Sequence, residues 1–368
     1  MSAVAVPWAS THLDRSRSSI LEVARDSLGL YVAPPVSHLE LAARLPGYRT
    51  DELERLLLDR KAIGLRTLRG SAFLIPVDLL SIVVPATRAK NVRAFGGYVR
   101  KALVTDTYET WADRIDELLA GGEALTKAEI KERLDPSDGD LRALNFVVSQ
   151  MATESRLVGL RRFSSWRSAQ IAYTRWSDWL PEVDVETPDP GDARRELARM
   201  YFRSFGPATI GDFAWWSGLT KTQARRAVEE GAIPASGEAM FGLESEVSSS
   251  AGVRLLPIWD TLFVTWRDRS RLIPDALLPF VYDSSGNATS VVLVDGVVAG
   301  VWSLGRDDDL EILAAPFDSF TPGQWEEIEA EGQIVARLAG KDSARLVRRS
   351  DPPDLVAGKR NLFMRPLS

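Results

Sequence analysis

Apolar and polar positions repeat along the chain in one order: two short amphipathic helices, then residues that favour β-strands. In the first copy, residues 38–45 carry apolar side chains at helical spacing, and Ser37 and Glu40 have the spacing of a capping box. Asp51 begins a second helical pattern, and residues 65–76 place strand-forming residues on both sides of a Gly-Ser turn. The first copy therefore predicts a helix pair followed by a small hairpin.

Two further copies have the same order. In the second copy, Thr126 and Glu129 have capping-box spacing, and strand-forming residues begin at Leu157. In the third copy, the second helix begins at Thr220, and the strand part is expected near Ile233. A helix, a turn, a helix and a hairpin make up the winged-helix variant of the helix-turn-helix, whose second helix can enter a major groove of DNA. The pattern therefore predicts three winged-helix units.

Other segments connect and follow these copies. Residues 79–119 have a helical pattern, and the acidic, Pro-rich residues 181–191 have the composition of a linker. Asp295 and Gly296 lie between two Val-rich runs, which is a strong hairpin signal, and residues 324–338 form an acidic helical pattern. The predicted parts of this α+β chain are winged helix 1 (15–80), a helical connection (81–120), winged helix 2 (121–180), a linker (181–192), winged helix 3 (193–250) and a β-rich C-terminal region (251–368).

Composition excludes several kinds of chemistry. The chain has no Cys, and His12 and His38 are its two histidines, so thiolate metal sites are excluded and little remains for an imidazole metal site or a Ser-His-Asp triad. We therefore expect no metal and no cofactor. No apolar run approaches the roughly 18 residues of a membrane span, and the first ten residues lack the pattern of a leader. We expect a cytoplasmic protein without a membrane partner, and a monomer, because no segment has the pattern of a dimer helix.

The charge balance argues against a uniformly basic nucleic-acid binder. The chain has 45 Lys and Arg against 51 Asp and Glu, for a net charge of -6. Acidic residues gather in the linker and the C-terminal helix, whereas arginine gathers on the predicted hairpins, so a local basic face remains compatible with the total. The candidate DNA-binding residues are Arg66, Arg69, Arg161, Arg162, Arg167, Lys221, Arg225, Arg226, Arg267, Arg269 and Arg271. For the hairpin and helix positions, the alternative is ordinary surface charge that keeps the protein soluble.

Three of these arginines alternate in residues 267–271. In an extended chain, Arg267, Arg269 and Arg271 would lie on one face about 6 to 7 Å apart. This separation is similar to the roughly 7 Å step between phosphates of one DNA strand, and it predicts a ridge that contacts the backbone. The alternative is that Asp268 pairs with an adjacent arginine and that the remaining arginines are solvated.

Several motifs occur in the order found in a known protein family. They are Leu28-Gly29-Leu30, Leu68-Arg69-Gly70-Ser71, Gly206-Pro207-Ala208-Thr209, Trp216-Ser217-Gly218-Leu219, Arg267-Asp268-Arg269-Ser270-Arg271-Leu272 and Leu293-Val294-Asp295-Gly296. With these motifs the chain resembles the winged-helix DNA glycosylases of the AlkZ-like, azinomycin-resistance type. The resemblance implies three tandem winged helices around a concave DNA-binding face, with a β-rich C-terminal part.

The resemblance also implies a reaction, which is metal-free hydrolysis of the N-glycosidic bond of bulky or alkylated purines, including crosslinks. In the family, a Gln-apolar-Gln or Gln-apolar-Asp motif follows the Gly-Leu pair and positions the water. Side chains separated by one position point to the same side of an extended segment. Here Tyr31, Val32 and Ala33 replace that motif, and Phe73 stands where many relatives have a histidine. Tyr31 keeps a hydroxyl, whereas Ala33 can neither accept a proton nor orient water.

Two main hypotheses follow from these observations. In the first, the chain is a lesion glycosylase that uses Tyr31 and a displaced carboxylate, with Asp260 and Asp268 as catalytic candidates. In the second, it is a non-catalytic relative that binds double-stranded DNA, alkylated or not, or a DNA-reactive natural product, and acts in resistance, sequestration or regulation. For both carboxylates the alternative role is pairing with a nearby arginine. A third class, a ligand-binding transcription factor, would require binding to a specific operator sequence.

Overall fold

The computed structural model describes residues 11, 13–136, 139–236, 240–242, 251–283, 286–305 and 310–350. The contacts divide the chain into two compact units. Unit 1 comprises Met1–Thr50, Ser204–Ala208 and Leu243–Ser368, and unit 2 comprises Asp51–Arg203 and Thr209–Gly242. Residues 351–368, at the end of the predicted β-rich C-terminal region, lie outside the described residues, as does His12.

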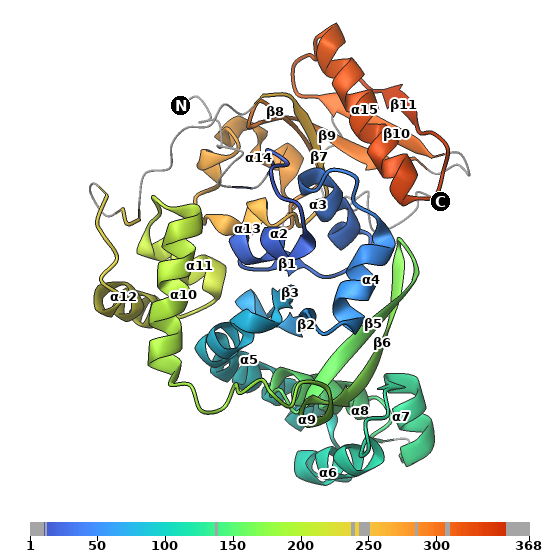
Figure 1. The fold of residues 1–368 in the computed structure, drawn as a ribbon, viewed down its shortest axis with the longest axis vertical. Coiled ribbons are helices and arrows are strands. Elements are labelled where there is room, and N and C mark those ends of the chain that lie inside the picture. The colour runs from blue at the N-terminus through green and yellow to red at the C-terminus, as the bar shows by residue number, and fades with distance from the viewer. Residues whose placement is uncertain are drawn as a thin grey trace. The chain divides into compact units, whose positions relative to one another are not determined.

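Unit 1 is built around a five-stranded sheet with the order β11-β10-β9-β8-β7. Its strands are β7 (Val253–Leu256), β8 (Val291–Val294), β9 (Val297–Leu304), β10 (Glu311–Pro316) and β11 (Arg345–Arg348), antiparallel except for the parallel pair β10 and β11. The turn between β8 and β9 has positive φ at Asp295 and Gly296, as the sequence predicted for a tight hairpin. Helix α15 (Pro322–Leu338) packs against β7 and β11 (Figure 1).

The helices of unit 1 are short, apart from α15. They are α2 (Ile20–Asp26), α3 (Val36–Arg44), α13 (Leu262–Thr265) and α14 (Leu278–Val281), with 3-10 turns at Arg269–Arg271 and Asp275–Leu277 and a two-residue strand, β1 (Leu30–Tyr31). Helix α3 contacts α15 and β7. All nine residues of α3 are buried, which includes its polar side chains.

Unit 2 is mostly helical and contains two hairpins. Its helices are α4 (Thr50–Leu58), α5 (Leu80–Ala102), α6 (Tyr108–Leu118), α7 (Lys127–Leu134), α8 (Ala143–Thr153), α9 (Trp176–Trp179), α10 (Pro190–Phe205), α11 (Ile210–Ser217) and α12 (Lys221–Glu230), with 3-10 turns at Leu68–Gly70 and Val77–Leu79. The first hairpin pairs β2 (Ala62–Arg66) with β3 (Ala72–Pro76), and the second pairs β5 (Leu157–Ser165) with β6 (Ser168–Arg175), where β4 (Leu125–Thr126) joins β6. In Figure 1 the β5–β6 hairpin forms a long twisted ribbon.

One apolar cluster in unit 2 packs α5, α6 and α7 around α8. Leu144, Val147 and Met151 of α8 are fully buried, together with Trp111 and Ile115 of α6. These positions follow helical spacing, so a single face of each helix is removed from water. Each fully buried aliphatic side chain contributes about 1.5 to 3 kcal/mol to folding. This packing fixes the base from which the β5–β6 hairpin projects.

The predicted helix starts are confirmed in two copies and wrong in one. Thr126 with Glu129, and Thr220 with Gln223, form reciprocal capping boxes. Ser37 does not cap a helix, because α3 begins at Val36 and places Ser37 inside its first turn. In the third copy, a strand part was expected near Ile233. The described residues there contain one isolated β-bridge, between Ala235 and Phe241, and residues 237–239 lie outside the described residues.

Two kinds of feature are absent from the residues that the structure describes. None of their helices is both long and apolar enough to cross a membrane. No group of three or more His, Asp or Glu within these ranges is arranged to hold a metal ion.

Candidate functional site

Residues 31–33, where the sequence predicts a replaced glutamine motif, follow α2 through a left-handed turn. Leu28 has φ 54° and Gly29 has φ 116°, a backbone conformation that favours glycine at the second position. Beyond the turn, Val32 is buried whereas Tyr31 and Ala33 are half-buried. This alternation is what an extended segment produces, and it places Tyr31 and Ala33 on the same, more exposed side.

A buried carboxylate holds the backbone of this segment. The N–H of Tyr31 donates to Oε2 of Glu40 at 3.0 Å, and the N–H of Thr261 donates to Oε1 at 2.8 Å. Glu40 thereby joins β1 to the chain just before α13. Burial, together with the neighbouring Asp260 carboxylate, raises the pKa of Glu40 to about 7, and the charge of Arg44 opposes this rise.

Asp260, one of the catalytic candidates, is fully buried beside Glu40. Nη1 and Nη2 of Arg44 donate to its two carboxylate oxygens at 2.8 and 2.7 Å. Arg44 also donates to the carbonyl oxygens of Thr11 and Glu40 at 3.2 and 3.1 Å. A bidentate pair of this kind fixes both side chains and occupies the carboxylate. The geometry favours the alternative hypothesis for Asp260, in which it pairs with an arginine.

An aromatic pair lies at the same segment. The ring of Tyr31 is 5.5 Å from the ring of Trp259, with the planes tilted by 53°. Trp259 has φ 56°, which is unusual for a residue other than glycine, and its Nε1 donates to Oδ1 of Asn287 at 3.2 Å. Tyr31 and Trp259 therefore form a half-buried aromatic pair, and the backbone N–H of Tyr31 is held by Glu40.

The predicted arginine ridge is not extended. Residues Arg269–Arg271 form a 3-10 turn, and Asp268 caps it by accepting from the N–H and the hydroxyl of Ser270 at 3.0 and 2.7 Å. Arg269 stacks on the Tyr282 ring at 3.8 Å, and Arg271 donates to the carbonyl of Pro207 at 3.1 Å. The prediction of three arginines on one strand face is therefore wrong, because a side-chain cap and aromatic contacts bend this segment.

The first hairpin uses its arginines for internal contacts. The guanidinium of Arg69 lies 3.5 Å from the ring centroid of Trp215, and Nη1 donates to the Trp215 carbonyl at 3.1 Å. Arg66 is exposed, lies over Phe95 at 5.0 Å and donates to the Gly70 carbonyl. Arg69 therefore joins the hairpin to α11, whereas Arg66 keeps its guanidinium at the surface.

The other basic candidates of unit 2 are mostly exposed. Arg162 and Arg167 are exposed on the β5–β6 hairpin, where Arg167 lies 4.8 Å from the Trp166 ring. Lys221, Arg225 and Arg226 are exposed on α12, and Arg226 pairs with Glu230 at 2.7 Å. Arg161, by contrast, is buried. Five of these candidates, Arg162, Arg167, Lys221, Arg225 and Arg226, are therefore open to solvent.

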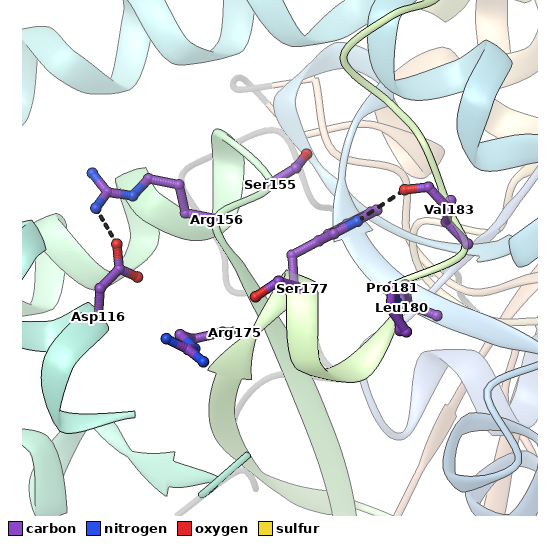
Figure 2. Close-up of a pocket in the computed structure, with 9 residues that line it drawn as sticks. Asp116, Ser155, Arg156, Arg175, Ser177, Leu180, Pro181 and Val183 are labelled. Carbon is purple, nitrogen blue, oxygen red and sulfur yellow. Dashed lines mark hydrogen bonds and ion pairs between the residues drawn. The ribbon is translucent and has the colours of Figure 1, made fainter. Parts of the chain in front are cut away.

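A cavity of about 560 Å³ lies beside α9, next to the start of the linker (Figure 2). Figure 2 shows Arg156 directed at Asp116, and Nη2 of Arg156 also lies 3.5 Å from Asp113. Arg175 pairs with Asp178 at 2.8 Å. Because both arginines of this cavity are engaged by carboxylates, its charge is largely balanced.

Sequence reasoning missed the residues that organise the Tyr31 segment. Glu40 was expected to complete a capping box with Ser37, and Glu40 and Arg44 are four positions apart on the predicted helix, which is the ordinary pattern of solvated charge. Trp259 carried no local signal. The composition of α3 did carry a signal that this helix is buried. Apart from Glu40 and Arg44, residues 39–45 are Leu and Ala, which leaves little polar surface.

Comparisons with known proteins show the family to which the chain belongs. The family model described as DNA glycosylase AlkZ-like matches residues 26–338. The interstrand DNA cross-link repair glycosylase of Streptomyces sahachiroi is 28% identical over 256 residues, which is 62% of this chain and 66%, slightly less than two thirds, of that relative. The solved structure of the Streptomyces sahachiroi DNA glycosylase AlkZ has a similar fold, with a TM-score of 0.71 and 19% identity over 94% of this chain and 100% of that chain. Because the family match covers well over half of its length, the chain belongs to the AlkZ-like DNA glycosylase family.

Proposed function

We propose that this chain binds duplex DNA carrying bulky alkylated purines or crosslinks without efficient release of the damaged base. The observation that carries the proposal is Ala33, because a methyl group stands where the family motif has its second polar side chain. Glu40 holds the backbone of this segment, so its shape is retained. The segment nevertheless lacks the second polar side chain that would orient a water molecule. In this role the protein sequesters lesions or protects DNA, as a resistance protein does.

The DNA contacts in this proposal come from winged-helix units that act together on a concave face. In this proposal the helix pair α7–α8 and the β5–β6 hairpin form one winged helix, and its exposed Arg162 and Arg167 contact phosphates. The pair α11–α12 forms another, in which exposed Lys221 and Arg225 reach the backbone. With a net charge of -6, non-specific affinity should be modest and lost quickly as salt rises. The protein works as a cytoplasmic monomer in this scheme.

A second candidate function is active base excision with Tyr31 as the residue that orients water. The half-buried Tyr31 and its contact with Trp259 favour it, because this pair offers a hydroxyl beside an aromatic surface on which a displaced base can stack. Asp260 is less suitable than Tyr31 for this role, since it is fully buried against Arg44.

Two measurements test the proposal together. Fluorescence anisotropy compares binding to matched duplexes with and without an N7-alkylated guanine, and a single-turnover assay follows abasic sites on the alkylated duplex. We expect salt-sensitive binding, tighter to the alkylated duplex, with base release no faster than without protein. Abasic-site formation that Tyr31→Phe abolishes would establish the second candidate instead. Failure to bind either duplex at low salt would refute both.

A further inference from the structure

A second cavity, of about 230 Å³, lies within unit 2 between the first hairpin, α7–α8 and the second hairpin. Its lining residues are Gly64, Leu65, Arg66, Ala72, Lys127, Ser149, Ala152, Thr153, Gly159, Arg161, Ile171 and Tyr173. This set of described residues includes three cationic side chains and no carboxylate. It differs in this respect from the cavity in Figure 2, whose lining includes Asp116 paired with Arg156.

Arg161 is built into the wall of this cavity. Its side chain comes from β5 and is buried, and Nη1 donates to the carbonyl oxygen of Gly64 on β2 at 2.9 Å. A Cβ atom on Gly64 would lie 1.9 Å from that Nη1, so glycine at this position is what lets the guanidinium approach the strand. The fold therefore makes room for a buried cation here.

Lys127 supplies a second cation, placed at the first position of α7. Its Nζ donates to the carbonyl of Asn145 at 3.0 Å and to the hydroxyl of Ser149 at 2.6 Å. An ammonium group has three donors, so these contacts orient the group and leave capacity for a further acceptor. Burial, together with the neighbouring charges of Arg66 and Lys131, lowers the pKa of Lys127 to about 8.

We propose that this cavity binds a phosphate group through Arg66, Lys127 and Arg161. Cations held close together in a partly desolvated site repel one another, and a bound anion relieves that repulsion while it accepts their N–H groups. A water molecule has about 30 Å³ of liquid volume, so the cavity has room for a phosphate group with waters. The phosphate can come from the DNA backbone or from free phosphate; its use by DNA rests on the proposed function, whereas binding of free phosphate does not.

The test measures the reactivity of Lys127 in the intact chain. At pH 8, in buffer free of phosphate and sulfate, the protein is labelled with an amine-acetylating reagent, and mass spectrometry gives the rate for each lysine peptide. About half of the Lys127 amine is neutral at this pH, and an anion that raises its pKa by one unit lowers the labelling rate about fivefold. Inorganic phosphate and a short duplex are added separately, each against chloride at equal ionic strength. Exposed Lys341 is the internal control, and its rate should not change.

Each outcome decides a different point. Slower labelling of Lys127 with both phosphate and duplex establishes the site and its occupation by a DNA phosphate. Slower labelling with phosphate alone, in a sample that binds duplex by anisotropy, establishes the site and removes DNA as its source of phosphate. The same result in a chain that binds no duplex refutes the proposed function and leaves the site standing. If neither ligand slows labelling beyond the chloride control, the inference is overturned.

Discussion

Arg44→Met tests whether the buried cluster below Tyr31 depends on one cation. Arg44 lies between two carboxylates, with a bidentate pair to Asp260 and Glu40 at 4.0 Å. Its side chain is almost completely inaccessible to water, as are both partners. Methionine has similar length but no charge, so the substitution leaves two buried carboxylates facing each other.

The expected loss is large. Removing one partner of a buried ion pair costs about 3 to 5 kcal/mol, because the remaining charge is uncompensated. The free energy of unfolding of a domain is typically about 5 to 15 kcal/mol, so this loss is a large fraction of the stability expected for unit 1. Four hydrogen bonds donated by Arg44 disappear as well, and the buried Asp260 carboxylate then keeps only the printed bond from the N–H of Leu262 to its Oδ1 at 3.0 Å.

The loss should also depend on pH. The pKa of Glu40 is already raised from 4.5 to about 7, so the native state binds its proton more tightly than the unfolded chain does. Stability from this group therefore increases as pH falls from about 7 towards 4.5. Without Arg44 the pKa of Glu40 rises further. The difference in unfolding free energy between the original protein and Arg44→Met should therefore shrink as pH falls over that interval.

Urea denaturation of the full chain at pH 7.5 and pH 5.5, followed by tryptophan fluorescence, measures both effects. Arg226→Met is the matched control, because it removes an exposed arginine that pairs with Glu230, and it should leave the midpoint nearly unchanged. A loss for Arg44→Met below about 1 kcal/mol, or a loss that grows as pH falls, would show that the cluster is not held as described.

Three further predictions concern DNA and the cavity. Tyr31→Gln combined with Ala33→Gln should produce base release from N7-alkylguanine duplex in the single-turnover assay, since the backbone anchor is independent of these side chains; no release with unchanged binding would show that more than the motif is missing. Replacing Arg162 and Arg167 by Gln should lower the slope of log affinity against log salt by about 1.8, at about 0.9 per phosphate contact, and an unchanged slope in anisotropy would exclude the hairpin as a DNA contact. Gly64→Ala should displace the guanidinium of Arg161 and lower the free energy of unfolding in urea by about 1 to 3 kcal/mol. It should also abolish the slowing of Lys127 labelling by phosphate; if phosphate still slows labelling, Arg161 does not take part in the site.

Local patterns predicted what local forces determine. The capping boxes at Thr126 and Thr220 and the turn at Asp295 involve residues within three positions of one another, so the sequence was sufficient. Ser37 and Glu40 have the same local pattern, but Glu40 accepts from the N–H of Thr261, 221 residues away. A contact at that separation outweighs a cap that would contribute about 1 kcal/mol.

The sequence offered candidates for the site but not the contacts that organise its surroundings. The resemblance singles out Tyr31 and Ala33, which stays a prediction, whereas the pairing of Arg44 with Asp260 joins residues 216 positions apart and carries no periodic signal. The bend at Arg269 follows from the Asp268 cap and from stacking on Tyr282. The alternation of charged residues along the chain reveals neither of these contacts. Lys127 was missed because a lysine at the start of a helix has no distinguishing pattern.

The anchor at Glu40 grips a peptide N–H rather than a side chain of the motif segment. Any residue except proline supplies that N–H, so positions 31 and 33 can be exchanged while the backbone keeps its course. Reactivity and shape are thus encoded by separate residues in this part of the molecule. A small library varied at those two positions would sample different chemistries on one unchanged frame.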